Sequence, residues 1–495
     1  MSKPKHAKSG ARSRDFDFPG YFTTARAWES APESRPYWHH LQRAWDEFGL
    51  CGVLCLEGKP TIYFKAVARA DLQKEAEWQK MLWNQGMAAM LVVQDPMKTR
   101  IYSALARPQK EAVLDSNDAR LATELSTAAF ALEVFLFSVQ TGQFYREHPG
   151  KFDAEVAIDQ YLLHNLGGAR DDLVATKFDD ALKPETAHAF LGRCLFTSYL
   201  LERGVIGKKQ LDAIGAPVAT KLHHMLRQIS NKREAVTALF KLFRLLDEDF
   251  NGSMFGGSFT EEQSSLRARH VEVLIKLLSG YDFVQEQPVL DFDFYDFRLI
   301  PIELISAIYE DFISAGEQQA EVPKNHGKSK TMRRKTGAYY TPPRLAELVV
   351  DIATENWDTL LDKRCLDPAC GSGVFLVILF QRMAAEWRRK HSSADNVTRA
   401  IELRRLLTTN LQGVDSDPTA CMVACFSLYL AFLDQLDPPD IWKLKQALEQ
   451  LGTEKVLPPL LEMPEGAVTG CPVVLAENFF NPEVAAAGKF HLVIG

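Results

Sequence analysis

The chain has few cysteines for its length, eight in 495 residues. A framework of disulfide bonds needs a much denser supply, so none is expected. The two closest pairs, Cys51 with Cys55 and Cys421 with Cys425, lie in apolar surroundings and lack a second pair of ligands nearby. A structural zinc site normally uses four such ligands. The sequence therefore predicts neither a disulfide-stabilised fold nor a bound metal.

Long hydrophobic runs are also absent. No apolar run approaches the roughly 20 residues that a membrane-spanning helix needs. The first residues, Met1 to Arg14, are basic and polar, and no apolar segment of the signal-peptide kind follows them. We therefore expect a cytoplasmic protein without a membrane partner.

An excess of basic charge is lacking as well, because 64 acidic residues outnumber 57 basic ones and give a net charge of −7. This balance argues against nonspecific coating of nucleic acid. A local basic run can still follow a phosphate backbone. The strongest such run is residues 321–336, which we expect to be a linker, either a solvated one or an arm that contacts phosphates.

Apolar residues are plentiful, at 46% of the chain, and the length allows two to four domains of roughly 100–200 residues each. Residues 1–34 are expected to be a disordered basic tail. Residues 35–110 contain short β-prone runs around one helical stretch, which predicts a small α/β domain. The runs are Cys51–Leu56, Thr61–Phe64 and Met90–Val93, and the helical stretch is Leu72–Trp83.

Residues 111–320 have a helical pattern instead. Apolar residues recur at three- and four-residue spacing in Phe190–Leu201 and Val236–Leu246. Pro301 is well placed for the first turn of a further helix, Ile302–Phe312. This region predicts an all-α domain.

Residues 337–495 alternate between helices and strands, which predicts a parallel sheet of the α/β class. In chain order the expected elements are helix Pro343–Asn356, strand Arg364–Leu366, helix Gly373–Lys390, strand Leu411–Val414, helix Pro418–Phe432, strand Val473–Ala476 and a terminal strand at Phe490–Ile494.

A glycine-rich turn, Asp367-Pro368-Ala369-Cys370-Gly371-Ser372-Gly373, follows the first of these strands. Glycine lets the backbone turn sharply and approach a ligand, and the next helix directs its positive N-terminus at whatever binds there. A tight strand-to-helix turn has the same composition, so this motif alone leaves both interpretations open.

One βα unit later, Gly413-Val414-Asp415-Ser416-Asp417 places acidic residues at the end of the next strand. Open α/β sheets commonly hold the ribose hydroxyls of a nucleoside at this position. Asp415 is the residue that we expect to do so. The alternative is that Asp415 or Asp417 caps the helix that begins at Pro418.

These motifs resemble those of class I S-adenosylmethionine-dependent DNA methyltransferases that methylate adenine N6, in the branch found in type IIG restriction-modification and phage-defence proteins. The segment Thr336-Gly337-Ala338-Tyr339-Tyr340-Thr341-Pro342-Pro343 carries a third motif in the family's order. The resemblance implies a Rossmann-like domain that binds S-adenosylmethionine and methylates an adenine flipped out of double-stranded DNA.

The resemblance also implies contacts to the methionine end of the cofactor. Thr341 and Asp367 would contact its carboxylate and amino groups. The backbone at Ala369, Gly371 and Gly373 would pass close to the cofactor.

The nucleoside end would be held by residues farther along the chain. Asp415 would bind the ribose. Asn478 stands where the family often has an aspartate that contacts the adenine of the cofactor, and Phe479 or Phe480 would stack on that ring.

In related proteins the first domain is often a metal-dependent nuclease, in which paired acids and a lysine bind the metal and polarise the attacking water. Here the run Pro60–Lys65 supplies the strand and the lysine, but no acid stands two residues before Lys65. Glu57 and Asp71 are poorly spaced substitutes. We expect a degenerate nuclease-like domain, or one that supports specificity, followed by the family's helical connector.

After Gly495 the family would continue with Asn-Pro-Pro-aromatic, whose Asn side chain and Pro carbonyl accept hydrogen bonds from the adenine amino group. The sequence does not contain this motif, so no catalytic residue is assigned. The strand at Phe490–Ile494 would also form an exposed apolar edge. We expect a C-terminal continuation or a second chain to complete the sheet and the catalytic loop, and this chain alone to be inactive. Subunits of a defence system are further candidate partners.

Two other interpretations stay open. In one, the cofactor fold is a noncatalytic scaffold or sensor that binds partner proteins or DNA. In the other, the methyl group goes to RNA or to a protein glutamine, because planar amide and base nitrogens need similar acceptor geometry.

Overall fold

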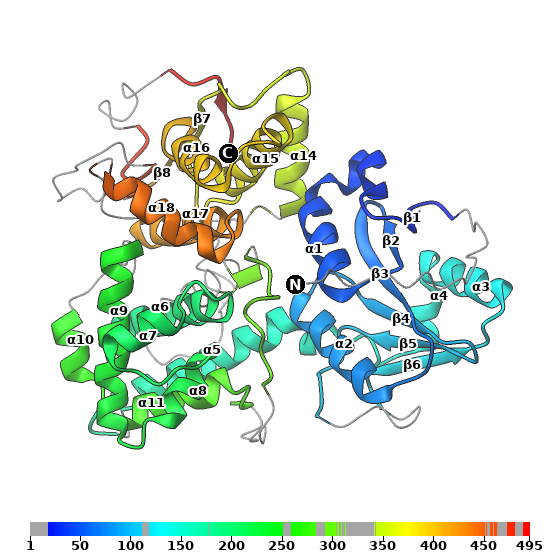
Figure 1. Ribbon diagram of the computed structural model, residues 1–495, viewed down its shortest axis with the longest axis horizontal. Helices are drawn as coiled ribbons and strands as arrows, with labels where there is room; N and C mark the ends of the chain where they lie inside the picture. The colour runs from blue at the N-terminus through cyan, green and yellow to red at the C-terminus, as the bar shows by residue number, and fades with distance from the viewer. Residues whose placement is uncertain are drawn as a thin grey trace, which may run out of the picture. The chain divides into compact units, whose positions relative to one another are not determined.

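The computed structural model describes most of the chain (Figure 1). The described residues are 18–110, 118–176, 178–250, 259–283, 293–302, 304–305, 308, 312, 341, 343–450, 452, 456–458, 460–462, 473–480 and 489–495. Contacts divide the chain into two compact units, Met1–Ala157 and Ile158–Gly495. The predicted linker, residues 321–336, lies outside the described residues.

The first unit is built on a six-stranded sheet in the order β1-β2-β3-β4-β5-β6. Neighbouring strands are antiparallel except β3 and β4, which are parallel because α2 makes the crossover between them. The strands are β1 (Tyr21–Phe22), β2 (Gly52–Leu56), β3 (Lys59–Ala66), β4 (Met90–Gln94), β5 (Thr99–Ser103) and β6 (Leu121–Leu125). The helices are η1 (Ala27–Ser30), η2 (Pro32–Tyr37), α1 (Trp38–Phe48), α2 (Leu72–Gln85), α3 (Ala129–Gln140), α4 (Gln143–Glu147) and η3 (Ala154–Val156).

Helices cover both faces of this sheet. Side chains alternate along each strand, so successive residues pack against helices on opposite faces. Phe64 of β3 belongs to a core cluster that includes Phe135 of α3 and Phe144 of α4. Tyr63, the preceding residue, faces the other side, where its ring lies 6.3 Å from that of Phe48 in α1. The predicted strands and the helix of this region are all present.

The first unit is nevertheless larger than the predicted domain of residues 35–110. Part of the predicted disordered tail is ordered from residue 18 onward, since β1 pairs with β2 and Trp28 is fully buried. β6, α3 and α4 extend the fold past residue 110, so residues 118–157 do not belong to the helical domain to which they were assigned. A strand of two residues is too short to show alternation, which is why β1 escaped prediction.

The second unit begins with helices, as the apolar spacing predicted. In the described residues they are α5 (Ile158–Val174), α6 (Pro184–Glu202), α7 (Lys208–Ile214), α8 (Leu222–Gln228), α9 (Lys232–Phe250), α10 (Phe259–Ser265) and α11 (Ala268–Leu278).

A parallel sheet follows, in the order β11-β7-β8-β10-β9. The predicted strands and helices are confirmed, whereas α16, α18 and β9 were not foreseen. The elements are α14 (Pro343–Thr354), β7 (Cys365–Asp367), α15 (Val374–Lys390), α16 (Asn396–Asn410), β8 (Leu411–Asp415), α17 (Pro418–Asp434), α18 (Pro438–Gln450), β9 (Leu461–Glu462), β10 (Val474–Ala476) and β11 (Leu492–Val493).

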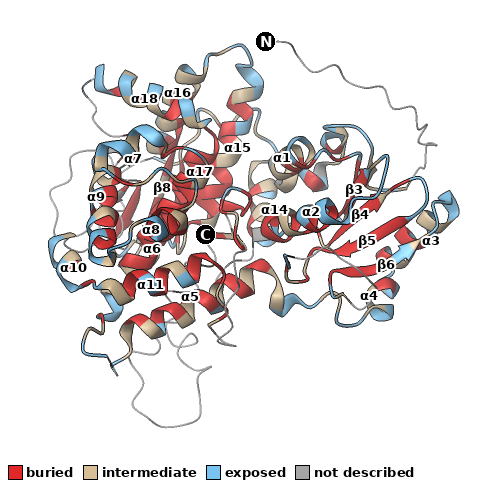
Figure 2. Ribbon diagram, turned by 60° about the horizontal axis from the view of Figure 1, so that its bottom comes forward, coloured by how far each residue is buried: buried red, intermediate tan, exposed pale blue. Residues whose placement is uncertain are grey.

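The helical part and the sheet part of the second unit share a packed interface. The ring of Phe196 in α6 lies 6.0 Å from that of Phe426 in α17. Arg203, just after α6, forms an ion pair with Asp434 at the end of α17. Buried residues concentrate in these helices and in the strands (Figure 2). The sheet part of the second unit therefore packs against its helical part through α17.

A separate question is whether any helix could enter a bilayer. Within the described residues, no single helix is long and apolar enough to cross a membrane. Ala420–Asp434 and Pro438–Gln450 reach the required length and composition only as a pair, which is bent by 106°.

Candidate functional site

Several polar residues lie along the carboxyl edge of the parallel sheet. β7 ends at Asp367, which pairs with Gly413 of β8. β8 ends at Asp415, which pairs with Ala476 at the end of β10. Parallel strands present their carboxyl ends at one edge, so Asn478, two residues beyond β10, follows the same edge. The structure thus brings three predicted site residues to one side of the sheet.

The strand order changes direction beside Asp367. The chain runs from β7 to β8 and on to β10, whereas β11 is added on the other side of β7. Ligands of open α/β sheets bind outside the carboxyl ends of the strands at such a switch point. A Cβ built on Gly495 would lie only 3.1 Å from Asp367 Oδ1, so the end of β11 borders this place.

The loop after β7 contains two glycines, and each is required there for a different structural reason. Both have positive φ, +51° at Gly371 and +83° at Gly373, which favours glycine. A Cβ on Gly373 would meet the Cβ of Ala424 in α17 at 3.0 Å, so this glycine is needed for packing. A Cβ on Gly371 would meet no atom of a described residue within 4 Å. Gly371 therefore borders open space where a ligand could approach the backbone.

Asp367 is the most unusual residue of the edge. Its side chain is 1% exposed, and Oδ1 accepts a hydrogen bond from Ala369 N at 3.1 Å. Oδ2 is buried and has no hydrogen-bond partner among the described residues. Burial raises the pKa of this carboxyl to about 7, with a smaller contribution from the charge of Asp415. A buried polar atom without a partner calls for an explanation, and a donor on a ligand supplies one.

Asp415 holds the glycine loop. Its Oδ2 accepts a hydrogen bond from Gly371 N at 2.9 Å, and its Oδ1 accepts one from Asp417 N, also at 2.9 Å. The second bond forms a turn just before α17. It does not test the alternative that Asp415 or Asp417 caps this helix. Each carboxylate oxygen can accept a further hydrogen bond. The carboxylate therefore retains capacity for a hydroxyl.

The two aromatics after β10 lie in different surroundings. Phe479 is partly buried and packs on the row Leu366, Val414 and Leu475, which crosses three strands. Phe480 is 86% exposed, and its ring meets that of Phe479 edge-on at 5.7 Å. Phe479 is fixed to the sheet and Phe480 extends from it.

Asn478 is exposed and is engaged in a local turn. Its Oδ1 accepts a hydrogen bond from Phe480 N at 3.0 Å. Its side-chain amide is left to offer donors at the carboxyl edge.

Thr341 is partly buried and lies directly ahead of α14. Tyr340, Pro342 and the earlier part of the predicted motif lie outside the described residues. Arg382 of α15 bonds Asp351 of α14 at 2.8 Å, which ties α14 to the helix that follows the glycine loop. The structure does not bring Thr341 into a described contact with Asp367.

Sequence reasoning missed the residues that pack beneath the glycine loop, between it and α17. Cys421 Sγ lies 3.6 Å from the carbonyl oxygens of both Asp415 and Leu475. A hydrogen bond with the Cys421 thiol and burial hold the pKa of Cys370 well above its usual value, so this thiol stays neutral.

Gly413 also supports the loop, and the sequence could have shown this, because a glycine inside a strand often marks a close approach of another part of the chain. A Cβ there would lie 2.7 Å from Leu376 of α15.

The second candidate site, in the first unit, is closed. Lys65 Nζ donates to the backbone oxygens of Phe48 and Gly49 and lies 4.3 Å from the centroid of the Trp78 ring. Burial lowers the pKa of this lysine. Tyr63, at the position where a nuclease would carry an acid, is fully buried.

The substitute acids lie elsewhere in the first unit. Glu57 is in the turn between β2 and β3, about 20 Å along the strand from Lys65 at roughly 3.3 Å per residue. Asp71 caps α2 by accepting a hydrogen bond from Lys74 N at 3.2 Å. Among the described residues of this unit, no three side chains of metal-binding type gather.

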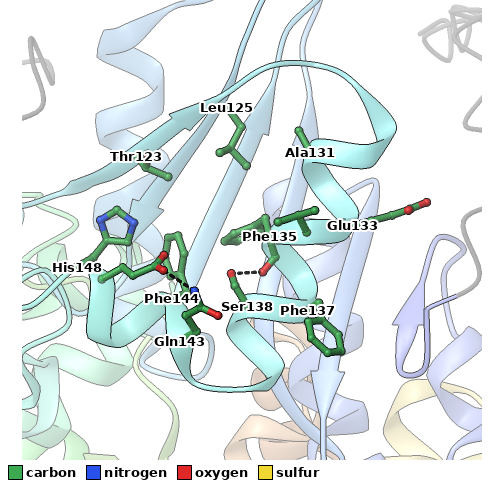
Figure 3. Close-up of a pocket in the computed structure, with 12 residues that line it drawn as sticks. Thr123, Leu125, Ala131, Glu133, Phe135, Phe137, Ser138, Gln143, Phe144 and His148 are labelled. Carbon is green, nitrogen blue, oxygen red and sulfur yellow. Dashed lines mark hydrogen bonds between the residues drawn. The ribbon is translucent and has the colours of Figure 1, made fainter.

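The first unit also has a surface hollow of about 580 Å³ between β6, α3 and α4 (Figure 3). Aromatic rings from Phe135, Phe137 and Phe144 line much of it. Glu147 at its rim already accepts a hydrogen bond from Gln143 at 2.6 Å. The hollow offers an apolar surface and carries no arrangement of reactive groups comparable with the edge at Asp367.

Together, the parallel sheet, the glycine loop and the buried carboxyl define an α/β protein with a candidate ligand site at the carboxyl edge of its sheet. Residues 308–431 match the family model described as N-6 DNA Methylase. This match covers the glycine loop, Asp367 and Asp415. No curated protein matches the chain significantly.

Three solved structures of restriction enzymes resemble the chain at low identity. They are the Type IIL restriction-modification enzyme MmeI in complex with DNA (TM-score 0.37, 14% identity, 68% of this chain and 42% of that one), a DrdV–DNA complex (0.29, 13%, 87% and 34%) and the type IIG restriction endonuclease BpuSI (0.26, 11%, 86% and 38%). The chain therefore spans less than half of the length of each of these proteins.

Proposed function

We propose that residues 337–495 form the N-terminal part of a Rossmann-like domain that binds S-adenosylmethionine in a DNA adenine-N6 methyltransferase of a restriction-modification or phage-defence system. One observation carries the proposal: Oδ2 of Asp367 is buried without a partner among the described residues, and the glycine loop that follows it borders open space at Gly371, inside the segment that matches the methylase family. The strand order agrees. Numbered along the chain without the two-residue edge strand β9, the order β10-β8-β7-β11 reads 3-2-1-4, as in the doubly wound fold.

The residues present fit the cofactor chemically. Its ammonium group can donate to the orphaned oxygen of Asp367, and Thr341 provides a hydroxyl for its carboxylate. Open space at Gly371 lets the main chain from Ala369 to Gly373 lie against it. When bound, S-adenosylmethionine supplies a methyl group on a positively charged sulfur.

The nucleoside end is assigned to the next strands. Asp415 accepts a ribose hydroxyl with its remaining capacity while it holds the loop in place. Asn478 offers its amide to the adenine of the cofactor, and Phe479, fixed on the sheet, offers its ring for stacking.

The acceptor is proposed to be an adenine flipped from double-stranded DNA. An acceptor-binding loop, in the continuing polypeptide or in a second chain, would complete the site. β11 supports this arrangement because Gly495 lies beside Asp367. A loop that joined the sheet at Gly495 would therefore start next to the proposed cofactor site. The first unit is proposed to be a nuclease-like domain that does not cleave DNA, since Lys65 is held by helix carbonyls.

The test is transfer of a labelled methyl group from S-adenosylmethionine to adenine-containing duplexes, by the complete protein that the gene encodes. Label in N6-methyladenine supports the proposal. A complete protein that binds the cofactor and leaves adenine, RNA and protein glutamine unlabelled would favour the second candidate, a noncatalytic scaffold or sensor. An in-frame Asn-Pro-Pro in the gene beyond codon 495 favours the enzyme, and a stop codon there favours the scaffold or a split enzyme.

A further inference from the structure

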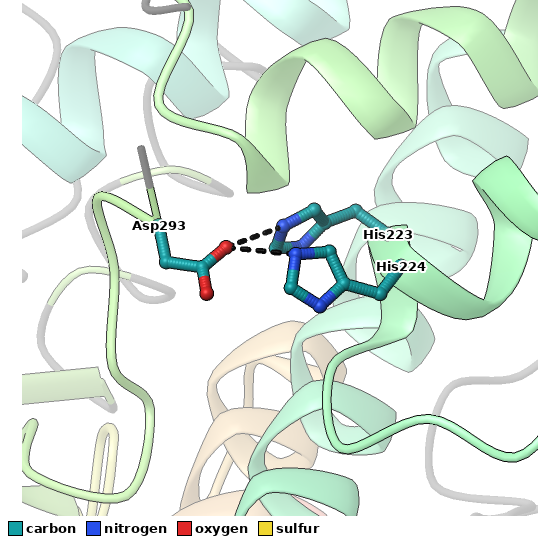
Figure 4. Close-up of side chains that lie close together, drawn as sticks. All are labelled: His223, His224 and Asp293. Atoms are coloured by element: carbon teal, nitrogen blue, oxygen red, sulfur yellow. Dashed lines mark hydrogen bonds and ion pairs between the residues drawn. The ribbon is translucent and has the colours of Figure 1, made fainter. Parts of the chain in front are cut away.

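Three side chains in the helical part of the second unit converge on one point (Figure 4). His223 and His224 lie in the first turn of α8, and Asp293 is about 70 residues farther along the chain. His223 Nε2 lies 3.1 Å from Asp293 Oδ1, and His224 Nε2 lies 2.9 Å from the same oxygen. Two neighbouring imidazoles therefore point their ring nitrogens at a single carboxylate oxygen.

This spacing suits a metal ion. In a tetrahedral zinc site with bonds of about 2.0–2.2 Å, neighbouring ligand atoms lie about 3.3–3.5 Å apart. The two nitrogen–oxygen distances are a few tenths of an ångström shorter, and all three ligand atoms lie within 4.8 Å of one another. Imidazole nitrogen suits zinc, copper, iron and nickel, and a carboxylate can complete such a site. An ion could enter with small side-chain movements.

The burial of the three residues combines one anchored ligand with two accessible ones. The side chain of His223 is 4% exposed, whereas those of His224 and Asp293 are 39% and 36% exposed. An ion can reach the cluster from solvent, and a water can occupy a fourth position.

One nearby charge opposes a cation. Lys221 Nζ lies 4.0 Å from Asp293 Oδ2, the oxygen that is not shared by the histidines. The same ammonium lies 3.7 Å from Glu202, so two carboxylates share its charge. Removing the charge of Lys221 should therefore strengthen metal binding.

A metal here would join parts of the connector that are distant in sequence. Asp293 begins a segment whose Tyr295 hydroxyl accepts a hydrogen bond from Asn165 of α5 at 3.0 Å. In the same segment, Phe297 N donates to Glu202 of α6 at 2.8 Å. We propose that His223, His224 and Asp293 bind a first-row divalent transition metal, with Zn²⁺ as the leading candidate, and that the ion fastens this segment to α8.

The experiment is titration of Zn²⁺ into the chelator-treated chain by calorimetry, with the melting temperature followed in parallel. We expect each chain to bind one Zn²⁺ at this cluster. Binding should raise the melting temperature, because a ligand that binds only the folded state stabilises it. His224→Ala and Asp293→Asn should each weaken this binding roughly tenfold or more, by analogy with losses at supporting positions of metal sites. Lys221→Met should tighten it.

His164→Ala is the matched control, because His164 is an exposed histidine of the same connector outside the cluster. It should bind Zn²⁺ like the unaltered chain. Circular dichroism would establish that His224→Ala remains folded. The proposal is overturned if the unaltered chain takes up no Zn²⁺, or if folded His224→Ala and His164→Ala bind it equally, which would move the ion to other ligands such as cysteines. Co²⁺ in place of Zn²⁺ should give a spectrum without thiolate charge-transfer bands.

Discussion

Lys65 in the first unit and Asp367 in the second occupy comparable places, each at the end of a strand in an α/β sheet, yet their surroundings are opposite. The ammonium of Lys65 is bonded to the carbonyl oxygens that end α1, and Tyr63 fills the place of an acid. The carboxyl of Asp367 is also buried, but one of its oxygens has no partner among the described residues, and the loop that follows it contains a glycine that borders open space.

The difference separates a site that the fold has closed from one that it has left available. In the sequence, the segments around Lys65 and Asp367 look alike, since each is a strand with a charged residue at its end. Burial of a polar atom costs free energy unless a hydrogen bond compensates it. In the first unit the chain supplies the compensation itself, and at Asp367 no described residue supplies it to Oδ2.

The largest expected effect concerns the two glycines of the loop at Asp367. Gly373→Ala should lower the free energy of unfolding of the second unit by about 2–5 kcal/mol, because it combines backbone strain with a contact to Ala424. Gly371→Ala should cost only about 1–2 kcal/mol, the strain of its positive φ. Urea denaturation would measure both. Equal losses would mean that Gly371 does not border open space.

The next effect is a pH dependence caused by Asp367. Its folded-state pKa of about 7 is above the ordinary aspartate value, so the folded state binds the proton more tightly. The free energy of unfolding should therefore fall as pH rises from about 4 to about 7. Asp367→Asn should lose this fall and be more stable than the unaltered protein at pH 8, by on the order of 1–4 kcal/mol.

Denaturation of both proteins at pH 5 and pH 8 measures this difference. Glu202 contributes a fall of the same sign in both, because burial raises its pKa to about 8. The comparison with Asp367→Asn therefore isolates Asp367. An unchanged pH profile would mean that the carboxyl has a partner in solution.

A smaller effect is expected at the closed site. Lys65→Met should cost about 1–2 kcal/mol, because it leaves the buried carbonyl oxygen of Phe48 without this donor. Neither the variant nor the unaltered chain should cleave duplex DNA with Mg²⁺. Cleavage that is present in the unaltered chain and lost in Lys65→Met would show that the first unit is an active nuclease.

The smallest effect is expected at Phe480. Phe480→Ala should change the free energy of unfolding by no more than about 0.5 kcal/mol, since the side chain is largely exposed. Its affinity for S-adenosylmethionine should also be unchanged if Phe479 is the stacking residue. Phe479→Ala is the matched variant, and it should lose affinity. The reverse result would exchange the two assignments.

Prediction from the sequence succeeded where one pattern decided the structure. The strands β7, β8 and β10 are apolar runs between strong turn signals, and they were found almost residue by residue. α16 and α18 were missed because each follows another helix without a strand between them, which breaks the simple alternation. The boundary at residue 110 failed because β6 returns to the first sheet after a stretch without a clear pattern.

For the candidate site, the sequence could place Asp367, Asp415 and Asn478 at one edge, because parallel strands share their carboxyl ends. It could not show that Asp415 holds the loop or that Oδ2 of Asp367 has no partner among the described residues, since both depend on tertiary contacts. The cluster of His223, His224 and Asp293 was missed for the same reason. Only the folded chain brings residues so distant in sequence within 3.1 Å.

The most direct measurement is a calorimetric titration of this chain with S-adenosylmethionine, comparing Asp367→Asn with Asp362→Asn. Asp362 is exposed and lies just ahead of β7, at the opposite end of the same strand. We predict that the unaltered chain and Asp362→Asn bind alike and that Asp367→Asn binds roughly ten- to a hundredfold more weakly, the effect of losing a charged hydrogen bond of about 1.5–3 kcal/mol. Equal affinity of the two variants, or no binding by the unaltered chain, would contradict the account.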